Sequence, residues 1–489
     1  MTPAELSDRR RLAILAICCM SLLIVAMDNT IVNVALPSIR KDLHASLSGL
    51  QWTVDAYTIV LASLLMLAGS TADRLGRRRT FQVGLALFAA GSLACSLAPT
   101  LGWLIAARAV QGIGGSMLNP VAMSIITNVF TDPRERSRAI GAWGATVGIS
   151  LGLGPIVGGA LIEAVDWRAI FWINVPIALG AIVLTALFVP ESRAARPRRV
   201  DPVGQLLVIV ALASLTYGII DGPRAGWGSA QTVALCAVAL AAVALFVPYE
   251  LRRRDPLIEP RFFRSAPFSG ATLIAVSAFA GFAGFLLLNT LYLQDVRGYS
   301  ALSAGLCTLP MAVLAGFASP FSGRLVGRVG ARPSLLFGGT CMLVAPLLLT
   351  SLTAHTPLAL LLGVYALYGL GFGSINPPIT YTAVSGMPNS QAGVAAAVAS
   401  TSRQVGQTLG VAVTGSILGT AATAVAGPGL AGASHPAWWV IGGCGGLVLA
   451  LGALSTGTWA KGTASRAAAE LEAEAPARAL EPSLGGRAA

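Results

Sequence analysis

Charged side chains are scarce in this sequence. Asp, Glu, Lys and Arg make up 11% of its 489 residues, whereas hydrophobic residues make up 55%. A typical soluble domain carries about 25% charged residues, and the mean hydropathy here is +0.73. A soluble fold cannot bury this much apolar surface. The composition therefore excludes an ordinary soluble protein and predicts an all-α integral membrane protein.

The patterns of metal sites and of nucleotide-dependent enzymes are missing as well. The chain has three histidines and seven cysteines, and none of them has the CxxC spacing of a metal site. It contains neither the GxxxxGKS/T loop that binds nucleotide phosphates nor the HExxH pair of zinc peptidases. We therefore expect no metal, no cofactor and no enzyme activity, and we expect no ATP-driven pump.

Long apolar segments dominate the chain instead. Windows of about 20 apolar residues, the length that crosses a bilayer, predict fourteen transmembrane helices. Three arginines precede the first apolar run, which is too long for a cleaved signal peptide and reads as a retained span. We expect the spans near residues 12–36, 51–70, 81–98, 101–125, 140–163, 168–189, 203–220, 229–249, 268–293, 301–322, 333–353, 357–385, 392–422 and 436–460.

The basic residues are distributed unevenly between the connecting loops. With a cytoplasmic N-terminus, 26 of the 33 Lys and Arg fall in cytoplasmic segments and five fall in outer loops. The remaining two, Arg108 and Arg403, lie inside spans. This pattern follows the positive-inside rule and predicts that both termini are cytoplasmic. The basic cytoplasmic loops also explain the net charge of +12. We therefore expect no nucleic-acid partner.

The chain contains an internal repeat. The segment GSTADRLGRRR at residues 69–79 matches SGRLVGRVGAR at residues 322–332, although Asp73 falls on Gly327. Duplicated halves are typical of transporters. We therefore expect a six-helix bundle over residues 1–190, two inserted helices with basic loops over 191–265, a second six-helix bundle over 266–460, and a cytoplasmic tail over 461–489. The composition of the tail predicts disorder or one short helix.

The loop GSTADRLGRRRT resembles the GxxxDRxGRR signature of the major facilitator superfamily. The segments MDNTIVNVALPSI, QWTVDAY and WRAIFWINVP resemble the fourteen-helix drug:proton antiporters of that superfamily, and the resemblance covers residues 12–460. It implies the major facilitator fold, and it implies that the loop latches the two halves together in the outward-open state. The candidate gating residues are Gly69, Asp73, Arg74, Gly76, Arg77 and Arg78.

A glycine-rich segment, GATVGISLGLGPIVGG at residues 144–159, follows in the fifth span. Glycines at intervals of four let helices pack closely, and the Gly-Pro pair permits a bend. The segment resembles the fifth-helix motif that distinguishes exporters from importers in the superfamily. It therefore implies export, with candidate residues Gly148, Gly152, Gly154, Pro155, Gly158 and Gly159.

Two oppositely charged residues lie inside the membrane spans. Asp28 interrupts the first apolar run, where a carboxylate costs roughly 2.5–3.5 kcal/mol. Arg108 opens the segment RAVQGIGGSMLNP, which resembles the family's fourth-helix motif RxxQGxG, tied there to proton coupling. Both residues lie about 10–12 Å below the outer ends of their helices. The sequence predicts this equal depth, and the family fold implies that the two residues can meet.

Other polar residues of the spans are candidates for coupling or for substrate binding. Asp55 matches the family's WxxDxY acid and is a second candidate proton carrier. It lies about four residues from the outer end of the second span, where we expect water to reach it. The substrate cavity has the candidates Asn29, Asn33, Gln111, Asn289, Asn376 and Arg403.

Together these features predict an exporter of amphipathic, drug-like molecules that works by alternating access. We expect the proton motive force to drive it, with Asp28 as the proton carrier. Its partners are then a small-molecule substrate, protons and the lipid bilayer, and we expect a monomer. Arg outnumbers Lys 31 to 2, and Ala and Gly are abundant, which points to a GC-rich bacterium and its cytoplasmic membrane. A dedicated exporter of one endogenous metabolite or siderophore remains open.

Overall fold

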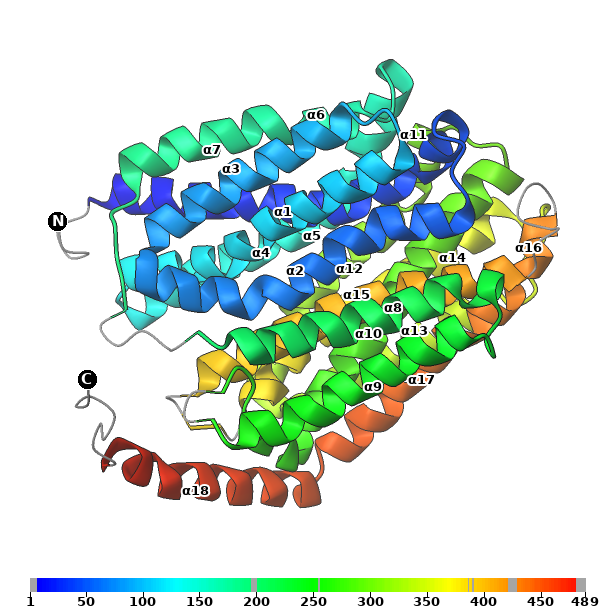
Figure 1. Cartoon of the computed structure of the whole chain (residues 1–489). Coiled ribbons are helices and arrows are strands. Elements are labelled where there is room, and N and C mark those ends of the chain that lie inside the picture. Colours follow the sequence, from blue (N-terminus) through cyan, green and yellow to red (C-terminus); the bar gives the residue numbers. More distant parts are fainter. Residues whose placement is uncertain are drawn as a thin grey trace.

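The computed structural model describes residues 7–194, 200–253, 256–385, 387–388, 391–420 and 429–480. The regular structure of these residues is helical, and they contain no strand. Long helices lie side by side, and α1 (Asp8–Asp42) begins at the end of the bundle where α18 (Thr458–Leu480) lies (Figure 1). The all-α class expected from the composition is confirmed.

The first part of the chain forms helices whose ends are set by capping residues. The side chains of Ser46, Thr100 and Asp132 each accept a hydrogen bond from the first turn of the helix that follows. Gly76 ends α2 with φ at +115°, a backbone conformation that favours glycine. After α1 come α2 (Leu47–Leu75), α3 (Arg77–Ser96), α4 (Leu101–Val129), α5 (Pro133–Ala164), α6 (Ala169–Trp172) and α7 (Asn174–Phe188).

The rest of the chain is also helical, and two of the expected spans are divided. The span expected at 168–189 is broken between α6 and α7, and the span expected at 301–322 is broken before Pro310, which lies in the first turn of a new helix. The remaining helices are α8 (Pro202–Ala225), α9 (Ala230–Leu251), η2 (Pro260–Arg264), α10 (Ala266–Leu291), the π-helical turn η3 (Tyr292–Val296), α11 (Ala301–Cys307), α12 (Leu309–Val329), α13 (Arg332–Leu347), α14 (Leu358–Val384), α15 (Ala392–Thr420), α16 (Gly429–Ala433) and α17 (His435–Ser455).

Eleven helical stretches within the described residues are long and apolar enough to cross a membrane. The other three expected spans correspond to α3, α13 and α15, which are helical but do not meet both conditions; α13, for example, has 16 residues. The chain is therefore a multi-pass membrane protein, and the count of fourteen spans stays a prediction.

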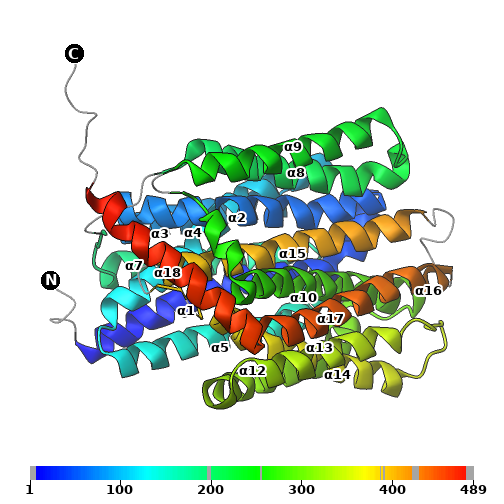
Figure 2. The same ribbon diagram turned by 90° about the horizontal axis from the view of Figure 1, so that it is seen from below.

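The helices form two groups that meet along two seams. In the first group α1 packs against α4, α5 and α7, and in the second α10 packs against α14, α15 and α17. One seam lies between α2 and α15, and the other lies between α5 and the pair α11 and α12. The helices α8 and α9 pack on each other, and α8 contacts both α2 and α15 (Figure 2). They therefore cover the first seam.

The tail contains a helix as far as the structure describes it. The helix α18 crosses the end of the bundle and contacts α10 and η2. The backbone N–H of Ala266 donates to Thr463 Oγ1 over 2.9 Å, and Arg264 pairs with Glu470 at 2.8 Å. A helix, one of the two alternatives expected for the tail, extends to Leu480, and residues 481–489 lie outside the described residues.

Candidate functional site

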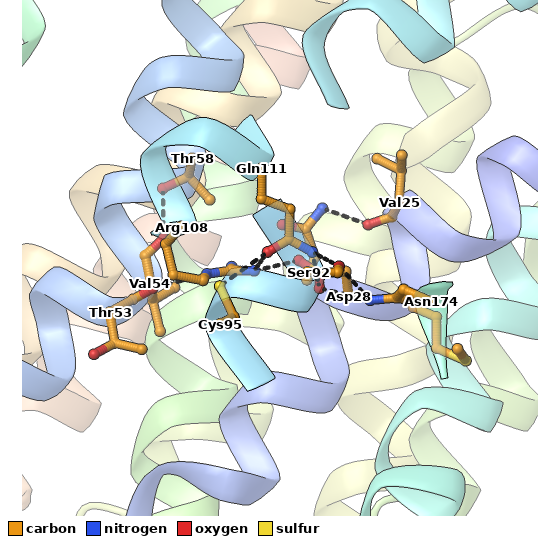
Figure 3. A network of polar contacts seen from close by, with 12 residues as sticks. Val25, Asp28, Thr53, Val54, Thr58, Ser92, Cys95, Arg108, Gln111 and Asn174 are labelled. Carbon is orange, nitrogen blue, oxygen red and sulfur yellow. Dashed lines mark hydrogen bonds and ion pairs between the residues drawn. The ribbon is translucent and has the colours of Figure 1, made fainter. Parts of the chain in front are cut away.

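A buried ion pair joins Asp28 of α1 to Arg108 of α4. Arg108 Nη1 lies 2.5 Å from Asp28 Oδ2, and the two side chains are 1% and 0% exposed. Gln111 Nε2 donates to Asp28 Oδ1 over 2.8 Å, and Asn174 Nδ2 donates to the same oxygen over 3.3 Å (Figure 3). Three donors therefore compensate the charge of a carboxylate that is fully buried.

The guanidinium of Arg108 is held from three further directions. Its Nε donates to the backbone oxygen of Thr53 over 3.0 Å, and its Nη1 also donates to Gln111 Oε1 over 2.7 Å. The guanidinium carbon lies 4.3 Å from the centre of the Tyr57 ring. Arg108 thus connects α4 to α1 and to α2, so a change in the charge of Asp28 would affect the packing of three helices.

Asn174 belongs to this network although we did not predict it as a site residue. It donates to Asp28 and, over 3.3 Å, to Ser92 Oγ, which also accepts from Gln111 Nε2 over 2.7 Å. The signal in the sequence was a lone amide directly after the apolar run AIFWI of the sixth span. The network therefore ties together α1, α3, α4 and α7.

Asp55 of α2 is buried, which corrects the expectation that water reaches it. The residue is 0% exposed, because α4 and α15 pack against α2 at this level. Thr58 Oγ1 donates to Asp55 Oδ1 over 3.4 Å, while Asp55 Oδ2 has no hydrogen-bond partner among the described residues. Thr58 Oγ1 in turn accepts from Thr408 Oγ1 of α15 over 2.9 Å. Asp55 thus lies one side chain away from the second group of helices.

A central cavity of about 210 Å³ lies between the two groups of helices. Helices α1, α2, α4, α5, α10, α14 and α15 contribute to its wall. The wall contains both aromatic side chains and amides, a combination that suits an amphipathic ligand. Four predicted cavity residues line it, namely Asn29, Asn33, Asn376 and Arg403.

Two predicted cavity residues lie elsewhere. Gln111 bonds within the Asp28 network described above. Asn289 is 1% exposed and bonds within its own group of helices, since it donates to the backbone oxygen of Phe285 over 2.7 Å and accepts from Tyr365 over 2.6 Å. Both amides therefore bridge helices and do not belong to the cavity wall.

The loop between α2 and α3 is bound to the segment that follows α7. Arg77 pairs with Asp73 at 3.2 Å, and the backbone N–H groups of Arg78 and Arg79 donate to the carboxylate of Glu191 over 3.1 and 3.3 Å. A Cβ on Gly76 would lie 2.5 Å from Glu191 Oε1, and the φ of +115° at this position would strain any other residue. Of the other predicted loop residues, Gly69 faces α4 and Arg74 is exposed.

The glycines of α5 face both groups of helices. Added Cβ atoms on Gly154 and Gly158 would meet Thr30 and Ile31 of α1. On the other side, a Cβ on Gly159 would lie 2.5 Å from the Cα of Leu302 in α11. Gly148 and Gly152 approach α12, and the backbone oxygen of Pro155 lies against Gly305. The predicted glycine motif is therefore the place where α5 contacts the second group of helices most closely.

Hydrogen bonds join the two groups of helices at the end opposite to the loop after α2. The charge pattern predicts that this end faces outward. A shared apolar core there contains Ile31 and Ile39 of α1 together with residues of α10 and α14. The polar contacts link Gln51 Nε2 to Ala412 O at 2.9 Å, Gln294 Nε2 to Val34 O at 2.9 Å, and Leu302 N to Glu163 Oε1 at 3.0 Å.

Comparisons with a family model and with curated proteins point to the same protein family. The model of the Major Facilitator Superfamily matches residues 18–411. The chain is 39% identical over 411 residues to "Multidrug resistance protein Stp" of Mycobacterium tuberculosis (strain ATCC 25618 / H37Rv), covering 84% of this chain and 76% of the relative. It is 35% identical over 418 residues to "Tetracenomycin C resistance and export protein" of Streptomyces glaucescens, covering 85% and 78%.

A further relative and a solved structure agree with this result. "Multidrug efflux pump LfrA" of Mycolicibacterium smegmatis is 35% identical over 407 residues, covering 82% of this chain and 80% of the relative. A bacterial homologue of the human lysosomal transporter Spinster, solved in an inward-facing and unoccupied conformation, matches with a TM-score of 0.63. It covers 95% of this chain and 99% of that chain at 17% identity, which shows a shared fold.

Proposed function

The chain belongs to the major facilitator superfamily and is a transporter rather than an enzyme, and we propose that it is a proton-coupled antiporter that exports amphipathic drug-like compounds. Relatives whose names describe multidrug and antibiotic efflux support export of this substrate class. The protein exports its substrate across the cytoplasmic membrane of a bacterium. Transport needs no cofactor and is driven by the proton motive force.

The observation that carries the proposal is the buried pair of Asp28 and Arg108 behind the cavity. Asp28 is the proton carrier. When it accepts a proton it loses its charge, and the guanidinium of Arg108 loses its anionic partner. A buried pair that is broken on one side is strongly destabilised, so protonation favours another arrangement of α1 against α4.

Helix α1 connects the proton site to the cavity. Asp28 contacts α4 and α7, while the next two residues, Asn29 and Thr30, line the cavity. Thr30 also lies against Gly154, in the part of α5 that contacts both groups of helices. A shift of α1 on protonation therefore changes the cavity wall and the contact with α5 together, which couples the proton to alternating access.

The proton motive force is large enough for this task. One charge that crosses 100 mV supplies about 2.3 kcal/mol. Since about 1.4 kcal/mol corresponds to a factor of ten, one electrogenic proton sustains roughly a 50-fold substrate gradient.

Everted membrane vesicles with an acidic interior provide the direct test. We expect a fluorescent amphipathic compound to accumulate inside the vesicles, and a protonophore that collapses the gradient should abolish the accumulation. Accumulation that persists without the gradient would contradict proton coupling. A panel of unrelated antibiotics in a pump-deficient host separates a multidrug exporter from a dedicated exporter of one metabolite.

A further inference from the structure

Arg403 of α15 is the one charged side chain among the described residues that line the central cavity. It lies near the middle of a 29-residue helix, far from either end. The two buried acids nearest to the cavity do not contribute to its wall, because Asp28 is paired with Arg108 and Asp55 lies behind Thr58. The charge that faces the cavity is therefore positive.

Arg403 has few partners for a guanidinium in this position. Its Nη2 donates to Thr380 Oγ1 over 2.5 Å, and its Nε is buried and has no hydrogen-bond partner in the described part of the chain. The guanidinium carbon lies 5.9 Å from the centre of the Phe279 ring. In the part of the chain that the structure describes, no carboxylate lies within ion-pair distance of Arg403.

Arg403 differs from Arg108, the other arginine inside the membrane spans, in its lack of a carboxylate partner among the described residues. Both arginines lie inside membrane spans, but Arg108 has a carboxylate at 2.5 Å and an amide at 2.7 Å. Charged side chains within the membrane usually have a partner or face a wet cavity that a ligand enters. Arg108 meets this condition within the protein, whereas Arg403 lines the central cavity and pairs with no carboxylate among the described residues.

The remaining wall fits the body of an aromatic acid. Phe282 and Phe372 stack with ring centres 4.2 Å apart, and Phe279 and Trp143 line the same cavity. Gln404 and Gln407, which follow Arg403 on α15, each have an amide oxygen that is buried without a partner. Such acceptors suit hydroxyl or N–H groups on a ligand.

We propose that the central cavity binds amphipathic monoanions, whose carboxylate or similarly acidic group pairs with the guanidinium of Arg403. A planar guanidinium forms two parallel hydrogen bonds to a carboxylate, which gives both affinity and orientation. The proposal rests on the proposed export function and narrows its substrate class to molecules with an apolar aromatic body and one negative charge.

Three probes of one shape test the charge preference. They are 1-naphthaleneacetate, 2-(1-naphthyl)ethanol and 2-(1-naphthyl)ethylammonium, and their binding is measured by calorimetry on the full chain in nanodiscs of zwitterionic lipid. We expect the anion to bind roughly tenfold more tightly than the alcohol, since hydrogen bonds between charged groups exceed neutral ones by about this factor. The cation should bind most weakly.

Two variants assign the preference to the residue. Arg403→Gln should lower the affinity for the anion roughly tenfold and leave the affinity for the alcohol unchanged, while Arg403→Lys should retain part of the preference. Arg224→Gln is the matched control, because Arg224 is an exposed arginine outside the cavity. If Arg403→Gln fails to fold, the probe series on the unmodified protein and on Arg403→Lys still tests whether the cavity prefers the anion.

The outcomes distinguish this proposal from the proposed function. Equal affinity for anion and alcohol, preference for the cation, no binding of any probe, or an Arg403→Gln variant that keeps its preference would each overturn the anion site. Binding needs no proton gradient. A charge preference in binding together with transport that ignores the gradient would therefore contradict proton coupling and leave the anion site supported.

Discussion

Asp28 and Asn29 are neighbours on α1, yet their side chains lie in two different environments. Asp28 is fully buried in a pair with Arg108, whereas Asn29 lines the central cavity. Successive residues of a helix point about 100° apart, so one short segment of α1 faces the interior of the first group of helices and the space between the two groups.

Asp28→Asn should abolish efflux driven by a pH gradient while the protein still reaches the membrane. Asparagine keeps an oxygen that accepts from Arg108 and Gln111, but it cannot take up or release a proton. Vesicle uptake and the amount of protein in the membrane measure the two effects. Asp166→Asn is the control, because Asp166 is a half-exposed loop acid. Efflux at the full rate in Asp28→Asn would show that another group carries the proton.

Asp55→Asn should retain gradient-driven efflux within about tenfold of the unmodified rate. Thr58 can still donate to the amide oxygen, and the contact between Thr58 and Thr408 is unchanged. The same vesicle assay, run beside Asp28→Asn, ranks the two acids. Complete loss in Asp55→Asn, with activity kept in Asp28→Asn, would reverse the assignment of the carrier.

Arg108→Ala should remove proton coupling and destabilise the protein by about 3–5 kcal/mol, because it leaves the charge of Asp28 buried without its main partner. Adding Asp28→Asn to this variant removes the orphan charge and should restore part of the melting temperature in detergent. Strictly additive losses in the double variant would mean that the two residues do not interact energetically. Substrate exchange without a gradient should survive better in the double variant than uphill efflux.

Gly159→Ala should lower efflux several-fold and cost about 1–3 kcal/mol of stability, the usual range for overpacking. Its new Cβ would lie 2.5 Å from the Cα of Leu302, which belongs to backbone that cannot easily move. Gly144→Ala is the matched control on α5, because nothing lies within 4 Å of its added Cβ. Melting temperature and vesicle uptake are measured for both. Equal behaviour of the two variants would contradict a role in export for the close contact between Gly159 and α11.

The sequence was sufficient for the class of protein, for the family and for the depth of the central pair. Two charges at equal depth in apolar helices, Asp28 and Arg108, have strong reasons to meet, and the structure brings them together at 2.5 Å. The close contacts of the α5 glycines were also predictable from the sequence. Glycines at regular intervals along a helix indicate that another helix packs closely against that face.

Other features depended on contacts that a sequence does not display. Asp55 was expected near water because of its position along α2, but α15 covers it. Asn289 and Asn376 look alike as lone amides, yet the first bonds to Tyr365 and the second lines the cavity. Depth can be counted along a helix, whereas the direction that a side chain faces is decided by the neighbouring helices.

The position of α8 makes the lipid-facing perimeter of the transporter asymmetric. Gln205 of α8 donates to the backbone oxygen of Ser63 in α2, and Tyr217 of α8 packs against Trp52 of α2, while Pro223 of α8 lies next to Gly419 of α15. Because α8 contacts both α2 and α15, a motion that parts these two helices would require α8 to slide over one of them. On the opposite side, Ile149 of α5 and Phe317 of α12 are exposed. One seam is thus covered by α8 and α9, while apolar side chains of the other face the acyl chains of the bilayer.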